Sequence, residues 1–160
     1  MQAAKGSGIW NRSQLRRLAF QVVFTLLSLN FLVPAATYLL APERAIAPLL
    51  DLGARLGWPE YPALAAESGS FVWRTLAATN VLTLGTLCVA LQWNVVRHYP
   101  LLFPLAFLKG ATALAFAGQW AVGFRHPLFL AIALWDGLAV FLFLFFASRA
   151  RAALLEERAL

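Results

Sequence analysis

The chain has 160 residues, of which 61% are hydrophobic and 12% charged, and its formal net charge is +6. A soluble domain carries about 25% charged residues, and one of this size cannot hide so much apolar surface from water. The composition therefore excludes a water-soluble fold and indicates a protein surrounded mostly by lipid. Basic residues stand at the ends of apolar runs and form no single patch, so nucleic acid is not expected as a partner. The one cysteine, Cys88, excludes an internal disulfide and a cysteine-rich metal cluster.

Four stretches are long and apolar enough to cross a bilayer, since a crossing helix needs about 20 residues. They lie at about 18–40, 71–93, 101–122 and 128–148. Lipid offers no partners to backbone amides, and the alternating pattern of a β-barrel is absent, so all four should be α-helices. The sequence predicts an all-α integral membrane four-helix bundle that forms a single transmembrane domain over residues 1–160. We expect the first stretch to be retained as a helix and not cleaved as a secretory signal.

The connections between these stretches predict their arrangement. The links at 94–100 and 123–127 are short, so consecutive helices should be antiparallel neighbours. The longer link at 41–70 is rich in proline, and within it the segment 45–57 mixes leucine and isoleucine with charged residues. That pattern predicts a short interfacial helix on the membrane surface. Trp58 and Tyr61 follow it, as expected of aromatic anchors at the level of the headgroups.

Lysine and arginine in the short loops predict the orientation, because cytoplasmic loops carry an excess of them. The side that holds both termini carries more of these residues than the side that holds the 41–70 segment. We therefore expect cytoplasmic N- and C-termini and an extracytoplasmic 41–70 segment. The two sets are Lys5, Arg12, Arg16, Arg17, Arg97, Arg149, Arg151 and Arg158 on the first side, and Arg44, Arg55 and Arg125 on the second.

Three charged residues, Arg74, Lys109 and Asp136, fall inside predicted spans. A charge at the bilayer centre costs at least about 2.5–3.5 kcal/mol, so unpaired ones are rare. Lys109 and Asp136 lie at similar depths on antiparallel neighbours, which predicts an ion pair facing the bundle interior. Arg74 lies one turn inside the second span, where it is expected to extend to the headgroups or to pair with Glu67 or Asp136.

Polar side chains within the spans leave two interpretations open. Threonines and Asn80 on the second span, with Gln119 on the third, either form hydrogen bonds between helices or line a polar cavity with Lys109 and Asp136. Trp135 stands beside Asp136 at mid-depth, where its indole N–H requires a partner.

The two histidines, His98 and His126, fall in loops on opposite sides of the membrane. They cannot hold one haem together within this chain. Neither has a carboxylate or a second histidine nearby in the sequence, so no metal site is expected.

Several short motifs carry a resemblance to a known group of proteins. They are Trp73 and Leu87-Cys88 within 71–88, Gln92, Pro104 followed by Lys109, and Trp135-Asp136-Gly137 ending in Arg149. In these features the last ninety residues resemble uncharacterised small bacterial four-helix membrane proteins. The layout is also similar to the DoxX-like group, some of which are associated with quinone-linked respiratory chemistry. The resemblance implies a bacterial inner membrane location and a Lys–Asp core, but no established activity.

The sequence contains no nucleophile–base set, metal cluster or phosphate-binding loop, so no catalytic residue is predicted. We expect an accessory or assembly subunit of a larger membrane protein complex, whose apolar face at 140–146 and basic termini contact other subunits or anionic lipid. One alternative is a binding protein or enzyme with a site for a quinone or lipid, headed by Lys109 and Asp136 and enclosed by Trp135, Phe107 and Phe116. Another is a small transporter, but a bundle of four helices is narrow for transport, so this alternative is less favoured. If a cofactor is bound, we expect it to be lipid or quinone.

Overall fold

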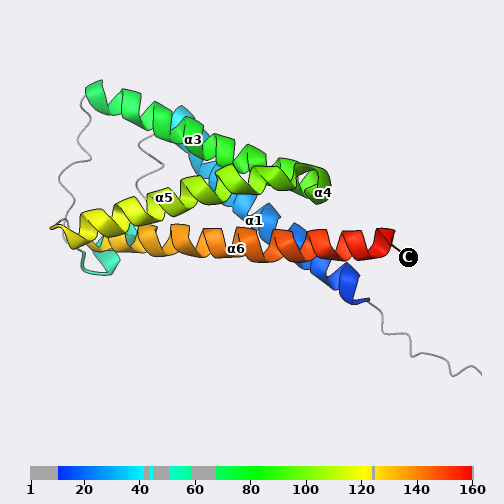
Figure 1. Cartoon of the computed structure of the whole chain (residues 1–160). Helices are drawn as coiled ribbons and strands as arrows, with labels where there is room; N and C mark the ends of the chain where they lie inside the picture. Colours follow the sequence, from blue (N-terminus) through cyan, green and yellow to red (C-terminus); the bar gives the residue numbers. More distant parts are fainter. Residues whose placement is uncertain (1–10, 42–43, 45–50, 59–67, 124, 160) are drawn as a thin grey trace, which may run out of the picture.

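The computed structural model describes residues 11–41, 44, 51–58, 68–123 and 125–159, and the side chains of residues 68–74 lie outside this description. Every regular element in the described residues is helical (Figure 1). Four helical segments are long and apolar enough to cross a membrane: Arg12–Leu40, Thr75–Trp93, Val95–Ala121 and Pro127–Arg158. The predicted all-α bundle with four membrane-spanning helices is thus confirmed.

The helix bounds explain how the chain extends past the bilayer. The long helices are α1 (Arg12–Leu40), α3 (Ser68–Trp93), α5 (Leu102–Ala121) and α6 (Pro127–Arg158). At 32 residues, α6 is about 48 Å long against a hydrocarbon core of about 30 Å. The predicted bounds are close for α3 and α5. The structure begins α1 earlier and ends α6 later, because polar turns continue both helices beyond the apolar stretch.

Two predicted connections differ in detail. The link at 94–100 forms a short helix, α4 (Val95–His98), and a 3-10 turn, Tyr99–Leu101. The Asn94 side chain caps α4 by accepting a hydrogen bond from the Arg97 backbone N–H at 3.0 Å. In the predicted interfacial helix, residues 51–55 are helical, whereas 45–50 lie outside the described residues, as does Tyr61.

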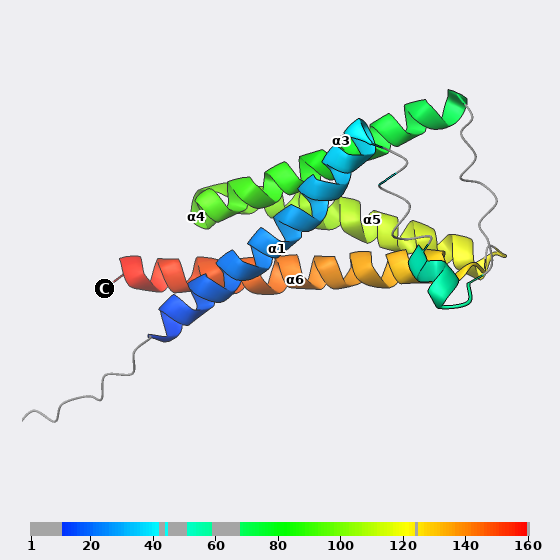
Figure 2. The ribbon, with the colours of Figure 1, turned by 180° about the vertical axis from the view of Figure 1, so that it is seen from behind.

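The helices form two antiparallel pairs, α1 with α3 and α5 with α6, which join where α1 packs against α6 (Figures 1 and 2). At the end where α4 connects them, α3 and α5 lie close together. Towards the other end, the α3 ribbon diverges from those of α5 and α6 in both views. The outer part of α3 therefore has α1 as its main neighbour.

The core follows from residues spaced three or four apart, which share one face of a helix. On α1 the buried stripe is aromatic, and on α6 it is mostly alanine, so α1 approaches α6 closely. Gly85 allows α1 and α3 to approach closely, since a Cβ at this position would lie 2.5 Å from the Leu32 Cδ2 atom. The stripes are Phe20, Phe24, Leu27 and Phe31 on α1; Ala139, Phe143, Ala147 and Ala150 on α6; and Leu84, Cys88 and Leu91 on α3.

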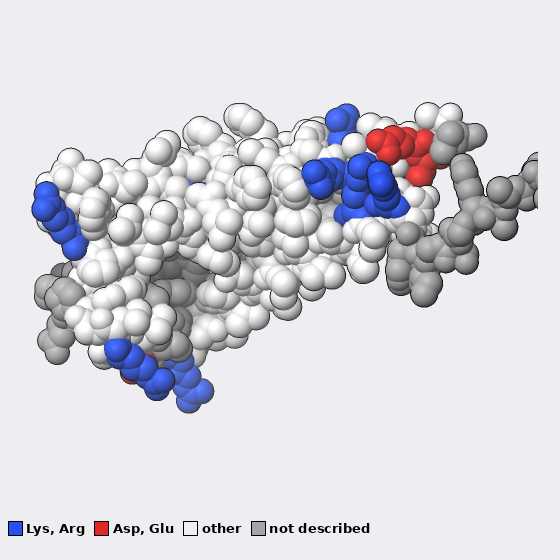
Figure 3. All heavy atoms as spheres, turned by 90° about the horizontal axis from the view of Figure 1, so that it is seen from below, with Lys and Arg blue, Asp and Glu red and all other residues white. Residues whose placement is uncertain are grey.

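Charged side chains gather at the two ends of the molecule and leave an uncharged band between them (Figure 3). We call the end formed by the start of α1, α4 and the last turns of α6 the basic end. It carries Arg12, Arg16, Arg17, Arg97, Arg149, Arg151 and Arg158. The other end carries Arg44, Arg55 and Arg125. The uncharged band fits the hydrocarbon layer, as expected of a multi-pass membrane protein.

Candidate functional site

A buried ion pair joins α5 to α6. Lys109 continues the buried stripe of Leu102 and Leu105 on α5, and Asp136 continues the stripe of Ala139 on α6. Lys109 Nζ donates a hydrogen bond to Asp136 Oδ1 at 2.5 Å. Lys109 is 9% exposed and Asp136 is 2% exposed. The ion pair expected from the similar depths of Lys109 and Asp136 in their spans is therefore present, and it faces the interior of the bundle.

The pair also reaches a third helix. The Lys109 Nζ lies 5.0 Å from the ring centroid of Phe31 on α1, within the range of a cation–π contact. Lys109 lies about 10 Å along α5 from its start, and Asp136 about 14 Å along α6 from the opposite end. The contact thus lies well inside both helices, where α1, α5 and α6 meet.

The electrostatics of this contact favour a structural role. The two charges neutralise each other, and the Phe31 ring replaces part of the water that the ammonium loses. A buried pair of this kind adds little net stability compared with apolar residues, but removal of one partner leaves an uncompensated charge. It therefore fixes the register of α5 against α6.

Three residues predicted to join the pair do not do so. The side chains of Asn80 and Gln119 are exposed, and Trp135 is 44% exposed. Gln119 is ten residues from Lys109, which places it about 15 Å along the helix. Trp135 precedes Asp136 and points about 100° away from it around the helix. The structure therefore does not bring Asn80 and Gln119 to the pair, as the cavity interpretation expects, and the side chain of Arg74 lies outside the described part of the chain.

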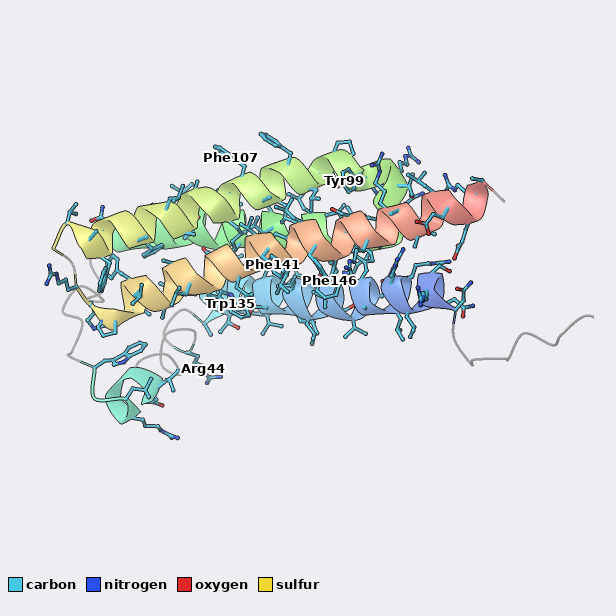
Figure 4. All side chains as sticks on the ribbon, turned by 60° about the horizontal axis from the view of Figure 1, so that its bottom comes forward. Arg44, Tyr99, Phe107, Trp135, Phe141 and Phe146 are labelled. Carbon is cyan, nitrogen blue, oxygen red and sulfur yellow. The ribbon has the colours of Figure 1, made fainter. Side chains whose placement is uncertain are left out.

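The aromatic enclosure predicted for a quinone ring is also wrong. Phe107 is 65% exposed and points away from the bundle (Figure 4). It stacks on Phe103, with ring centroids 6.0 Å apart. Phe116 packs against Phe129 at 5.4 Å. These rings contact neighbours on the outside of α5 and at the start of α6, so they do not surround the charged pair.

A polar cluster that the sequence analysis missed joins α1 to α3. Thr25 Oγ1 donates to Gln92 Oε1 at 2.8 Å, and Gln92 Nε2 donates to Ser28 Oγ at 2.9 Å. Gln21 Nε2 donates to the Gln92 backbone oxygen at 3.1 Å. The signal in the sequence is the spacing of Gln21, Thr25 and Ser28, which places all three on one face of the first span.

The histidines take local roles. The His98 ring nitrogen Nδ1 lies 2.8 Å from the Ala90 backbone oxygen. The His126 side chain accepts a hydrogen bond from the Leu128 backbone N–H at 3.2 Å and so caps α6. Its ring also contacts Trp58 edge-on, with centroids 6.2 Å apart. No group of three or more metal-ligating side chains occurs within the described residues.

At the basic end, α1 and α6 are joined by charged contacts. Arg17 Nη1 lies 3.3 Å from Glu157 Oε2, and Arg16 Nη1 lies 3.7 Å from Glu156 Oε2. A pocket of about 220 Å³ lies beside them, which we call the basic-end pocket. Its polar lining comprises Arg17, Gln21, Gln92, Trp93, Asn94 and Arg158.

Polar groups on the outer surface of the spans differ in how they are satisfied. Thr79, Thr83 and Thr86 each donate to the carbonyl four residues earlier in α3, so they do not bond to another helix as one interpretation predicted. Asn80 on α3 and Asn30 on α1 are exposed, and neither side chain forms a hydrogen bond with any described residue. Gln119 near the end of α5 is also exposed and forms no side-chain hydrogen bond with a described residue, but Asn30 and Asn80 differ from it in lying well inside their helices.

Comparison of the chain with protein-family models, with curated proteins and with solved structures found no match. The resemblance to small bacterial four-helix membrane proteins therefore stays a prediction, and the function is argued from the site alone.

Proposed function

We propose that this protein is an accessory or assembly subunit of a larger membrane protein complex. The observation that carries the proposal is the exposed amide of Asn80, which has no hydrogen-bond partner among the described residues. Asn80 lies about 18 Å along α3 from its start and about 20 Å from its end, so it stands near the middle of the span.

The bilayer interior makes this position costly for a lone subunit. Hydrocarbon supplies no hydrogen bonds, and a buried amide without a partner is destabilising by several kcal/mol on alkane-like scales. A helix from another protein that packs against α3 would supply a donor or acceptor. Towards its first residues, α3 diverges from α5 and α6 (Figures 1 and 2).

Other lipid-facing features support the same proposal. Asn30 presents a second exposed amide on α1. On α6, Phe141 and Phe145 stack with centroids 5.4 Å apart, and Phe141 belongs to the exposed apolar surface (Figure 4). Exposed aromatic rings fit either lipid or a partner helix, whereas the amides fit the partner better.

The alternatives have less support. A quinone or lipid site built on Lys109 and Asp136 would need access to the pair, but both side chains are buried and their charges are already matched. No contact within the described residues favours a transporter. The excess of arginine at the basic end favours its placement in the cytoplasm, and a bacterial inner membrane fits the resemblance.

The test is extraction of the full chain from its native membrane in mild detergent, followed by measurement of the mass of the particle. The proposal predicts a complex that contains other proteins in defined ratio. The Asn80→Leu variant should lose those proteins. Gln119→Leu makes the same change at an exposed site near the end of α5, where headgroup water satisfies the amide, and should retain them. A particle that holds only this chain, as a monomer or as a homo-oligomer, would contradict the proposal.

A further inference from the structure

The basic-end pocket has the size of a small polar group. Its volume of about 220 Å³ equals that of roughly seven water molecules at about 30 Å³ each. Its walls come from α1, from the junction of α3 with α4, and from the last turns of α6. Phe20, Val95 and Leu154 add an apolar part to the lining.

The free hydrogen-bonding groups in the pocket are mostly donors. Gln92 Oε1 already accepts from Thr25, and Asn94 Oδ1 already accepts from the backbone of Arg97. The groups left are the Asn94 amide N–H groups, the Trp93 indole N–H and two guanidinium groups. The side-chain acceptors left are Gln21 Oε1, whose Nε2 bonds to the Gln92 carbonyl, and the second lone pairs of Gln92 Oε1 and Asn94 Oδ1, so donors still outnumber acceptors.

The charge of the lining is positive. Arg17 has one nitrogen, Nη1, against Glu157 and keeps its other donors. Arg158 has no ion pair with any described residue. Guanidinium groups bind phosphate through paired N–H donors, which a carboxylate contact at one nitrogen does not exhaust. Two arginines from different helices, with neutral donors between them, match an anion with several oxygen atoms.

The pocket also lies where a lipid headgroup would be. Trp93, at the last residue of α3, is 87% exposed, as expected of a tryptophan at the membrane surface. Basic residues next to a span attract anionic lipids. We propose that the basic-end pocket binds the phosphate group of an anionic phospholipid, with Arg17 and Arg158 as the charged ligands and the apolar wall against the glycerol.

The experiment is native mass spectrometry of the full chain in mild detergent, titrated with phosphatidylglycerol and separately with phosphatidylcholine. We expect one phosphatidylglycerol molecule to bind more tightly than phosphatidylcholine. Arg17→Gln with Arg158→Gln should weaken that binding about tenfold or more, since each arginine contributes independently. Arg158→Gln alone keeps the contact between Arg17 and Glu157, so it should leave the fold intact. It should weaken phosphatidylglycerol binding by a smaller factor than the double variant does.

The matched control removes the same charge from the same end. Arg12 and Arg97 are exposed, do not line the pocket and have no ion pair with a described residue. The Arg12→Gln/Arg97→Gln variant should bind phosphatidylglycerol as the parent chain does. Equal loss in both double variants would overturn the proposal, because it would indicate attraction to the whole surface. Displacement of phosphatidylglycerol by an equal concentration of inorganic phosphate would overturn the lipid as the source of the anion.

Discussion

The two ends of this bundle are held in different ways. At the basic end, α1 is bonded to α3 through Gln92 and to α6 through two arginine–glutamate contacts. Towards the opposite end, α3 diverges from α5 and α6 (Figure 1), Thr79 and Thr83 donate to their own helix, and the Asn80 side chain bonds to no described residue. Among the described residues, side chains of different helices thus bond to one another mainly at the basic end.

This difference separates structural polar groups from interaction groups. The buried pair of Lys109 and Asp136 marks the centre of the bundle, and both charges are satisfied internally. Asn80 lies at a comparable depth and is not satisfied within the described chain. A charged residue in a span is therefore the weaker indicator of function here, and an exposed neutral amide is the stronger one.

The largest effect should come from Lys109→Leu at the centre. It leaves Asp136 buried without its partner, which should lower the free energy of unfolding by about 3–5 kcal/mol. The double variant Lys109→Leu/Asp136→Leu should recover most of the free energy of unfolding that the single variant loses. Equilibrium unfolding in mixed micelles, arranged as a double-mutant cycle, measures both. A single variant as stable as the parent would show that the pair does not hold α5 against α6.

The next effect separates a tight helix contact from an open one. Gly85→Ala places a methyl group 2.5 Å from Leu32, whereas Gly118→Ala meets nothing within 4 Å. Both gain the same helix propensity. Gly85→Ala should therefore be less stable than Gly118→Ala by about 1–3 kcal/mol, the usual cost of overpacking. Equal stability in thermal unfolding would mean that α1 and α3 are not in close contact there.

A smaller effect should come from the cluster that joins α1 to α3. Gln92→Leu removes hydrogen bonds to Thr25 and Ser28, which should cost about 1 kcal/mol if each is worth the roughly 0.6 kcal/mol measured in a membrane protein. Thr83→Val is the control on the open side, because Thr83 bonds only to its own helix. The same unfolding assay compares the stability of the two variants. A greater loss of stability in Thr83→Val than in Gln92→Leu would contradict the prediction.

The smallest effect should come from the surface ion pairs of the basic end. Arg16→Gln with Arg17→Gln removes two exposed contacts, each worth less than about 1 kcal/mol. This loss of stability should disappear at about 1 M salt, where the Debye length is only about 3 Å and exposed ion pairs are screened. Unfolding measured at low and high salt tests this, and a loss that does not depend on salt would indicate packing of the arginine stems instead.

The sequence predicts the membrane spans well, because their signal is composition and length. It also predicts the contact between Lys109 and Asp136, since short links and helix rise fix the two depths. It does not predict which face of α3 is covered, because that depends on how far α3 diverges from α5. Asn80 was therefore expected either to bond to a neighbouring helix or to line an inner cavity, whereas its side chain is exposed and bonds to no described residue. The partners of Gln92 were missed because α1 and α3 are separated by a long link, so no short turn fixes their register.

The most direct test is a density map of the complex that holds this chain, isolated from its native membrane. The account predicts a helix of another polypeptide packed along α3, with a polar group within hydrogen-bond distance of the Asn80 amide. A map in which acyl chains alone surround α3 at the level of Asn80 would contradict it.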